Sequence, residues 1–174
     1  MFKEFNNLSL FFEEPNREFN VREYSRLMKI SPATASKILQ DFYKKEILNE
    51  RKDRMLKLYK SNLDSDFYRD LKVFYNIRKL KDSDLIPQLN NFYLKPTIVL
   101  FGSASFGMDN ENSDWDMLVI SEKKEDFIDL KKFEKKLKRK IQMFNVKKVN
   151  DLGSENLINS VLNGIVIQGR LKWI

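Results

Sequence analysis

Residues 97–121, TIVLFGSASFGMDNENSDWDMLVIS, decide the fold of this chain. The run 97–101 is largely apolar and β-prone, and it ends directly in a turn of small residues at 102–107. A second β-prone run, 115–120, begins at Asp114 and Asp116, which alternate along it and therefore project to the same face. The stretch predicts two strands joined by a glycine turn, with paired carboxylates at the start of the second strand.

This combination of residues suits a phosphate ligand and a metal ion. Mg²⁺ prefers one or two carboxylates together with phosphate oxygens, so Asp114 and Asp116 are candidate ligands. Gly102 lets a phosphate approach the backbone closely, while amides around Ser103 and its hydroxyl can donate to the phosphate oxygens. The metal and the amides would meet at one triphosphate.

Residues 97–121 resemble the signature of the polymerase-β-like nucleotidyltransferases, in which an apolar strand, Gly-Ser and a spacer precede Asp-x-Asp in a second strand. The fuller pattern of the minimal nucleotidyltransferases of archaea and bacteria is met at Gly102, Ser103, Ser105, Gly107, Ser113, Asp114 and Asp116. The resemblance implies a mixed sheet flanked by helices. It also implies that a hydroxyl attacks the α-phosphate of a bound nucleoside triphosphate (NTP) and releases pyrophosphate, with Mg²⁺ or Mn²⁺ as cofactor. Asp114 and Asp116 would then be the catalytic metal ligands, and Gly102, Ser103 and Ser113 would bind the nucleotide.

The chain departs from this family at the third acid, which follows the helix after Asp-x-Asp. Here the helix is expected at about 123–140 and the next strand at 141–146, which puts Gln142 in the third metal-ligand position. An amide brings no negative charge, so nucleotide binding should survive better than transfer. Asp109, Glu111 or Asp151 can compensate only if the fold brings one of them there.

The first half of the chain has a different pattern. Val21 to Met28 has helical spacing, Ser31 reads as the N-cap of a second helix that begins at Pro32, and 47–59 alternates around a polar tip. Residues 20–60 therefore resemble a winged helix-turn-helix of bacterial and archaeal transcription regulators. The expected nucleic-acid-binding residues lie at the start of the second helix and on the wing: Ser31, Thr34, Ser36, Lys37, Arg51, Lys52 and Arg54. Protein docking, or a helical domain with a solvated basic face, remains an alternative.

The amino-acid composition excludes several kinds of catalytic group and metal site. The 174 residues contain no Cys and no His, which excludes disulfides, thiolate nucleophiles, Cys/His zinc sites and imidazole bases. The net charge is +7, and residues 21–60 alone carry 11 Lys plus Arg against 5 Asp plus Glu, so a polyanionic partner is expected. The Lys-rich run 131–140 is either a solvated helix face or a phosphate contact. No run approaches a membrane span and no leader pattern opens the chain, so we expect a soluble, cytoplasmic protein.

Together these features predict an α+β chain. We expect a mostly helical winged-helix domain at 1–80, a connecting helix at 81–95 and a minimal nucleotidyltransferase domain at 96–174. The expected function is Mg²⁺-dependent transfer of a nucleoside monophosphate from an NTP to a macromolecular hydroxyl on protein or RNA, with DNA or RNA bound by the winged helix. By family analogy a protein acceptor can be a partner ribonuclease. The alternative is a winged-helix regulator whose second domain binds nucleotide or a partner without efficient catalysis. Winged-helix readers often bind paired half-sites, which makes a homodimer an expectation as well.

Overall fold

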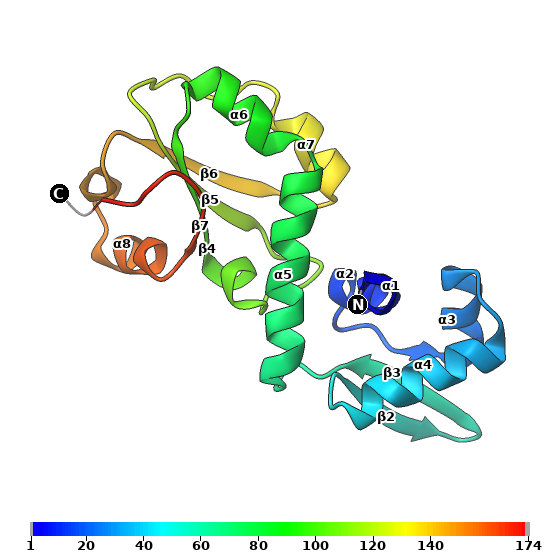
Figure 1. The fold of residues 1–174 in the computed structure, drawn as a ribbon. Coiled ribbons are helices and arrows are strands. Elements are labelled where there is room, and N and C mark those ends of the chain that lie inside the picture. Colours follow the sequence, from blue (N-terminus) through cyan, green and yellow to red (C-terminus); the bar gives the residue numbers. More distant parts are fainter. Residues whose placement is uncertain (1, 173–174) are drawn as a thin grey trace. The chain divides into compact units, whose positions relative to one another are not determined.

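The computed structural model describes residues 2–172, so residues 1 and 173–174 of the predicted domains lie outside the described part. The chain divides into two compact units, Met1–Lys72 and Val73–Ile174. Helix α5 (Asp66–Asp82) begins in the first unit and ends in the second (Figure 1). Within the described residues, no helix combines the length and the apolar character needed to cross a membrane.

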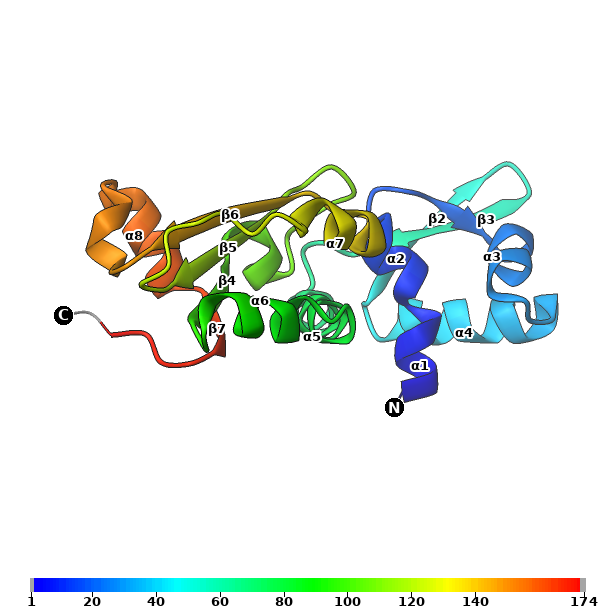
Figure 2. The same cartoon turned by 90° about the horizontal axis from the view of Figure 1, so that it is seen from above.

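The first unit alternates short helices with a small antiparallel sheet of strand order β1-β3-β2. Its elements before α5 are α1 (Phe2–Asn7), α2 (Ser9–Glu13), β1 (Phe19–Asn20), α3 (Val21–Met28), α4 (Pro32–Lys44), β2 (Leu48–Asp53) and β3 (Leu56–Ser61). Figure 2 shows α3 and α4 in succession beside the β2–β3 hairpin.

Local capping explains the two successive helices. The Asn20 side chain accepts a hydrogen bond from the Glu23 N–H at 2.9 Å, and α3 ends where Lys29 adopts a left-handed φ of 54°. The Ser31 hydroxyl accepts from the Thr34 N–H at 3.1 Å, with Pro32 as the first helical residue. The predicted start of the second helix is therefore confirmed.

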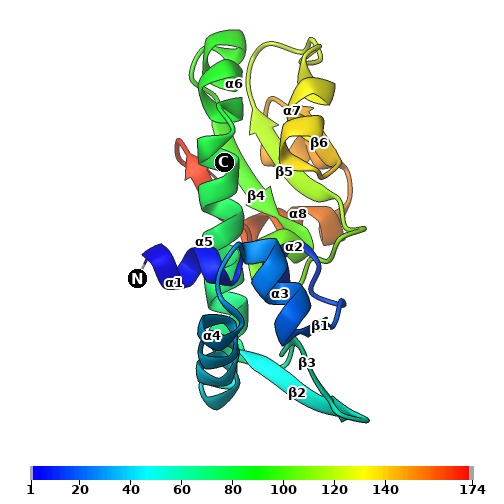
Figure 3. The same ribbon diagram turned by 90° about the vertical axis from the view of Figure 1, so that its right-hand side faces the viewer.

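Aromatic side chains form the core of this unit. Phe11 is fully buried, meets the Phe19 ring edge-on at 5.2 Å between centroids and also packs on Tyr24. The hydroxyls of Ser61 and Tyr68 both donate to the Phe11 carbonyl oxygen, which ties β3 and α5 to α2. The hairpin tip extends away from α4 (Figure 3).

The second unit is built on a four-stranded mixed sheet of order β6-β5-β4-β7. β4 is antiparallel to both β5 and β7, whereas β5 and β6 are parallel. Its elements after α5 are α6 (Leu85–Tyr93), β4 (Thr97–Phe101), the 3₁₀ helix η1 (Gly102–Phe106), β5 (Trp115–Ile120), α7 (Leu130–Leu137), β6 (Ile141–Val146), the 3₁₀ helix η2 (Val149–Leu152), α8 (Glu155–Leu162) and β7 (Ile165–Gln168).

Strand alternation creates two hydrophobic layers in this unit. Ile98 and Leu100 of β4 pack with α6 and α7 on one face of the sheet, whereas Val99 and Phe101 pack with α8 on the other (Figure 1). The sheet is therefore covered on both faces. This α+β arrangement confirms the coarse prediction of a mixed sheet flanked by helices.

The helix expected at 123–140 is shorter than predicted, because α7 occupies only Leu130–Leu137. The Ser121 hydroxyl accepts from the Lys123 N–H, and the Asn145 side-chain amide donates to the Lys123 carbonyl, so the chain leaves β5 as a turn. At the other end, Lys138 adopts a left-handed φ of 52° and ends the helix. Residues 138–140 thus form a tight connection into β6.

Candidate active site

The predicted metal and nucleotide residues meet at one end of the second unit's sheet. β4 ends at Phe101 opposite the start of the antiparallel β5, where Phe101 pairs with Asp116. β6 is parallel to β5, so it begins at the same end, and Asp116 pairs with Gln142. The glycine turn, the aspartates and Gln142 therefore come together as neighbours across three adjacent strands.

Gly102 makes the room that Asp116 occupies. Gly102 has a left-handed φ of +68°, and a Cβ built on it would lie 2.3 Å from Asp116 Oδ2. No side chain fits at this position unless the carboxylate moves. Burial, with a further contribution from the charge of Asp114, raises the pKa of Asp116 above its usual range. The two carboxylates thus repel each other at a partly buried position, and a bound cation would relieve this repulsion.

The predicted nucleotide-binding serines differ in their surroundings. Ser103 lies in η1, and its carbonyl oxygen accepts from the Met108 N–H at 3.0 Å, which closes the glycine turn. The Ser113 hydroxyl accepts from the Asn110 N–H at 2.9 Å and so holds the loop that leads to the exposed Asp114. Ser113 thus supports the conformation of this loop directly in front of the carboxylates.

Among the described residues, no acid joins Asp114 and Asp116 in a group of three that could hold a metal, and this includes Glu111, which lines a cavity together with Asp114. Asp109 is 1% exposed and accepts a hydrogen bond from Asn76, and Asp151 follows the far end of β6, where it accepts from the Lys148 N–H. Over residues 2–172 there is no group of three or more Asp, Glu, His or Cys side chains that could hold a metal. The site consists of a pair of carboxylates with the Gln142 amide beside them.

A buried amide that the sequence does not single out supports the turn. The Asn76 Nδ2 atom, on α5, donates to the Ala104 carbonyl at 3.0 Å and to Asp109 Oδ1 at 2.8 Å. It holds both η1 and the loop that follows it. Asn76 lies more than twenty residues before Ala104 in the chain, so no local sequence signal links the two.

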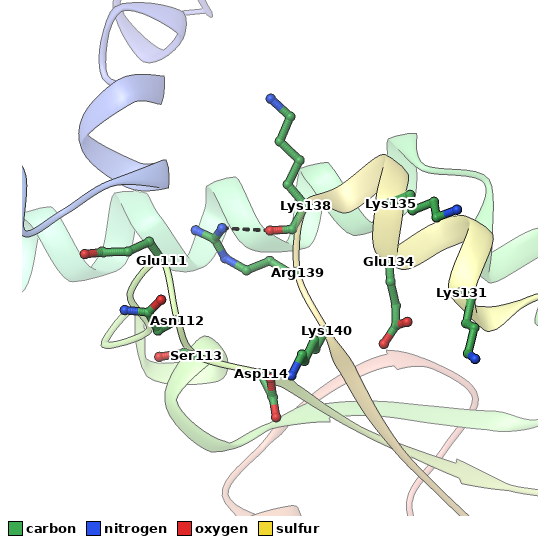
Figure 4. Close-up of a pocket in the computed structure, with 10 residues that line it drawn as sticks. All are labelled: Glu111, Asn112, Ser113, Asp114, Lys131, Glu134, Lys135, Lys138, Arg139 and Lys140. Carbon is green, nitrogen blue, oxygen red and sulfur yellow. Dashed lines mark hydrogen bonds between the residues drawn. The ribbon is translucent and has the colours of Figure 1, made fainter.

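A basic cavity of about 500 Å³ adjoins the carboxylates at Asp114. In Figure 4 its wall runs from the loop before β5 to α7, with Lys140 next to Asp114. Its lining residues are Glu111, Asn112, Ser113, Asp114, Lys131, Glu134, Lys135, Lys138, Arg139 and Lys140. Sequence reasoning noted the Lys-rich run 131–140 but did not place it beside the aspartates.

The backbone fixes the position of this basic segment. The Trp115 N–H donates to the Lys140 carbonyl at 2.9 Å, and the Glu134 carboxylate accepts from the Ile141 N–H at 2.9 Å. These two hydrogen bonds join α7, the start of β6 and the start of β5. Residues 138–140 are therefore held beside the candidate site rather than projecting as a loose tail.

The predicted nucleic-acid-binding residues of the first unit lie on its surface. Ser31, Thr34 and Lys37 are exposed at the start of α4, and Ser36 is half-buried. The hydroxyls of Ser31 and Thr34 lie 2.9 Å apart, so both belong to the helix cap.

The three hairpin cations predicted to bind nucleic acid, Arg51, Lys52 and Arg54, differ in their partners. Arg51 makes a two-point contact with Glu18, at 3.0 Å from Nε and 2.7 Å from Nη2. Lys52 and Arg54 form no ion pair with any described residue. Of the three predicted contacts, Lys52 and Arg54 are therefore the cations available to a ligand.

The donor set at the sheet end fits a divalent metal ion. An Asp116 carboxylate oxygen occupies the space that a side chain at position 102 would need, and the neighbouring Asp114 is exposed to solvent. Two carboxylates leave other coordination positions to water and phosphate oxygens, as Mg²⁺ prefers. Gln142, which pairs with Asp116 across β5 and β6, would offer a second ion a neutral amide oxygen.

The sequence comparison places this site in a family. Residues 85–171, half of the chain, match the family described as "Polymerase beta, Nucleotidyltransferase". No curated protein matches the chain at a significant level. The match covers α6, the glycine turn, both aspartates, Gln142 and the rest of the sheet. The chain therefore belongs to the polymerase beta nucleotidyltransferase family.

Proposed function

We propose that the second unit transfers a nucleoside monophosphate from an NTP to a hydroxyl of a macromolecule, with Mg²⁺ or Mn²⁺ as the cofactor. The observation that carries the proposal is the placement of Asp116 against Gly102, with Asp114 beside it at the same sheet end. Gly102 and Ser103 would contact the phosphates from the β4 side, and Ser113 would keep the Asp114 loop in place.

The chemistry is a single displacement at phosphorus. The acceptor oxygen forms a bond to the α-phosphorus, and the bond from that phosphorus to the bridging oxygen breaks. Pyrophosphate leaves with the bonding electrons, and the hydroxyl proton passes to water. A divalent ion held by Asp114 and Asp116 would neutralise phosphate charge. The protein orients the phosphates through the glycine turn and the two aspartates.

Gln142 should lower the rate of nucleotide transfer. Beside Asp116 it offers an amide oxygen where a third carboxylate would add a negative charge. We therefore expect the protein to bind NTP well but to transfer the nucleotide slowly. We also expect more transfer with Mn²⁺ than with Mg²⁺, because Mn²⁺ binds such oxygen and nitrogen ligands more tightly.

The test is transfer of α-phosphate label from each NTP into protein and RNA, with Mg²⁺ or Mn²⁺. Asp114→Asn and Asp116→Asn should abolish the labelling. Asp129→Asn is the matched control, because Asp129 is exposed and its side chain makes no capping hydrogen bond at α7. Absence of label with every metal and acceptor, in a protein that still binds NTP, would instead favour a binding domain without turnover.

A second candidate function concerns the first unit. We propose that it binds DNA or RNA as a winged helix, with α4 toward the bases and the β2–β3 hairpin toward phosphates. Its support is the exposed start of α4 and the unpaired Lys52 and Arg54 at the hairpin. If the second unit does not turn over, this candidate makes the protein a regulator.

This second candidate is tested by duplex DNA binding over a range of salt concentrations. Replacing Lys52 and Arg54 by glutamine should lower the magnitude of the slope of log K against log salt by about 1.8, the value for two phosphate contacts. The control is Lys124→Gln with Lys132→Gln, which removes the same charge from exposed positions of the second unit. Equal slopes in the two double variants would exclude the hairpin as a contact.

A further inference from the structure

A buried amide on α5 holds the two segments that lead to the candidate metal ligands. Asn76 lies in the part of α5 that belongs to the second unit, and its residue surface is 2% exposed. Its Nδ2 atom donates to the Ala104 carbonyl at 3.0 Å and to Asp109 Oδ1 at 2.8 Å. An amide nitrogen carries two hydrogens, so these two bonds use both of its donors. Ala104 belongs to η1, whereas Asp109 belongs to the loop between η1 and β5.

The bond to the Ala104 carbonyl acts on Asp116. Ala104 follows Gly102 by two residues in η1, and Gly102 makes the room that Asp116 Oδ2 occupies. The Ser105 hydroxyl donates to the Gly102 carbonyl at 2.8 Å, so the turn is braced from within. A displacement of Ala104 is therefore passed to Gly102. Because the carboxylate oxygen of Asp116 packs directly against Gly102, its position depends on this bond.

The bond to Asp109 acts on Asp114. Asn110, the next residue after Asp109, donates its N–H to the Ser113 hydroxyl at 2.9 Å, and its carbonyl accepts from the Ser113 N–H at 3.1 Å. These two bonds close a small loop directly before Asp114. Asn76 anchors the loop at its Asp109 end, so the same amide also holds the segment that carries Asp114 to the start of β5.

We propose that Asn76 is a positioning residue for the candidate metal site, and that its two N–H groups set the separation of the Asp114 and Asp116 carboxylates. The inference rests on the proposed transfer function and adds a residue that precedes the family match at 85–171. Mg²⁺ needs its ligand oxygens at about 2.0–2.1 Å in near-octahedral geometry, so a small displacement of one carboxylate weakens its binding. Asn76 is uncharged, so replacing it changes the geometry of the site without changing its net charge.

The experiment combines calorimetric titration of the full chain with Mn²⁺ and urea denaturation of the same proteins. The test variants are Asn76→Ala and Asn76→Gln, and the matched controls are Asn145→Ala and Asn145→Gln. The Asn145 amide likewise donates to two backbone carbonyls, those of Lys123 at 2.9 Å and Glu125 at 3.5 Å. It holds the turn that follows β5, at the opposite end of that strand from Asp116. Both pairs of variants therefore remove or displace an amide clamp, but only the Asn76 pair affects the candidate metal site.

We expect Asn76→Ala to raise the Kd for Mn²⁺ by about tenfold, the lower end of the range for residues that orient metal ligands. Asn145→Ala should leave this Kd unchanged, although both alanine variants should lose stability. Asn76→Gln keeps both N–H donors but carries them farther from α5 by one C–C bond of about 1.5 Å. It should therefore regain stability relative to Asn76→Ala while Mn²⁺ binding stays weakened. In an active preparation, kcat at saturating Mn²⁺ should remain below the wild-type value for both Asn76 variants.

Three results would overturn the proposal. The first is equal Mn²⁺ affinity in the Asn76 and Asn145 variants; if Asn76→Ala does not fold, the two glutamine variants decide. The second is recovery of Mn²⁺ affinity in step with stability in Asn76→Gln, which would leave Asn76 with a structural role alone. The third is a wild-type protein that binds no Mn²⁺. Failure of the transfer function is a separate outcome, because it appears as absence of labelled product while the calorimetric comparison still decides on Asn76.

Discussion

Replacing Gly102 by alanine measures how far the candidate site depends on the position of the Asp116 carboxylate. The added Cβ would lie 2.3 Å from Asp116 Oδ2, and ordinary contact begins near 3.4 Å, so the oxygen must move by about 1 Å. A misplacement of about 1 Å costs a reacting geometry about 100-fold. We therefore expect kcat/KM for transfer to fall about 100-fold, or ~2.7 kcal/mol.

The free energy of unfolding should respond much less. Alanine at the left-handed φ of +68° is strained by about 1–2 kcal/mol. The atom that it displaces is the end of a flexible side chain, so the overlap itself adds little. Gly153→Ala is the matched control, since Gly153 has a φ of +69° and no atom within 4 Å of the added Cβ.

The assay compares the two alanine variants by urea denaturation, by transfer of α-phosphate label and by calorimetric titration with Mn²⁺. Both should lose similar stability, while only Gly102→Ala should lose transfer and bind Mn²⁺ more weakly. The calorimetric arm does not require turnover. Equal activity and equal Mn²⁺ affinity in the two variants would contradict this prediction, because they would show that the space at Gly102 does not fix the position of the Asp116 carboxylate.

Three further predictions concern other residues. Gln142→Asp should raise transfer and lower the Mg²⁺ concentration for half-maximal activity by about tenfold, because it adds a charge beside Asp116; unchanged metal dependence would show that Gln142 is not at the metal. Ser31→Ala should destabilise the first unit by about 1 kcal/mol in thermal unfolding, through loss of the α4 cap, whereas a cost near zero would contradict the capping role. Burial alone would raise the pKa of Glu50, but hydrogen bonds from Lys57 and Tyr59 outweigh it and hold the pKa below its usual range. Glu50 therefore stabilises the fold above its unfolded-state pKa, and this contribution is lost as the pH falls through the folded-state pKa. Glu50→Gln should cost about 1–2 kcal/mol near neutral pH and remove part of the acid sensitivity; parallel stability curves against pH would contradict this.

Much of the local structure could be predicted because it depends on neighbours in the chain. The β4 strand, the glycine turn and β5 follow from alternation and small residues within 97–121. The start of α4 follows from Ser31 and Pro32, which act within one turn of the helix. The predicted length of α7 is wrong, because the Ser121 hydroxyl accepts a hydrogen bond from the Lys123 N–H and the Asn145 amide donates one to the Lys123 carbonyl, and these bonds outweigh the helical pattern of 123–129.

The amino-acid sequence alone shows which chemical groups this protein has available: paired aspartates after a glycine turn, Gln142 at the start of a later strand, and no Cys or His. Which of these groups meet depends on how the strands pair and the helices pack. The parallel register of β5 and β6 puts Gln142 beside Asp116, whereas Asp109 is buried against Asn76 and Asp151 lies beyond the far end of β6. The turn from α7 into β6 likewise brings a Lys-rich run to Asp114. Strand pairing and helix packing join residues that lie far apart in the chain, and no periodicity within a single segment encodes these distances.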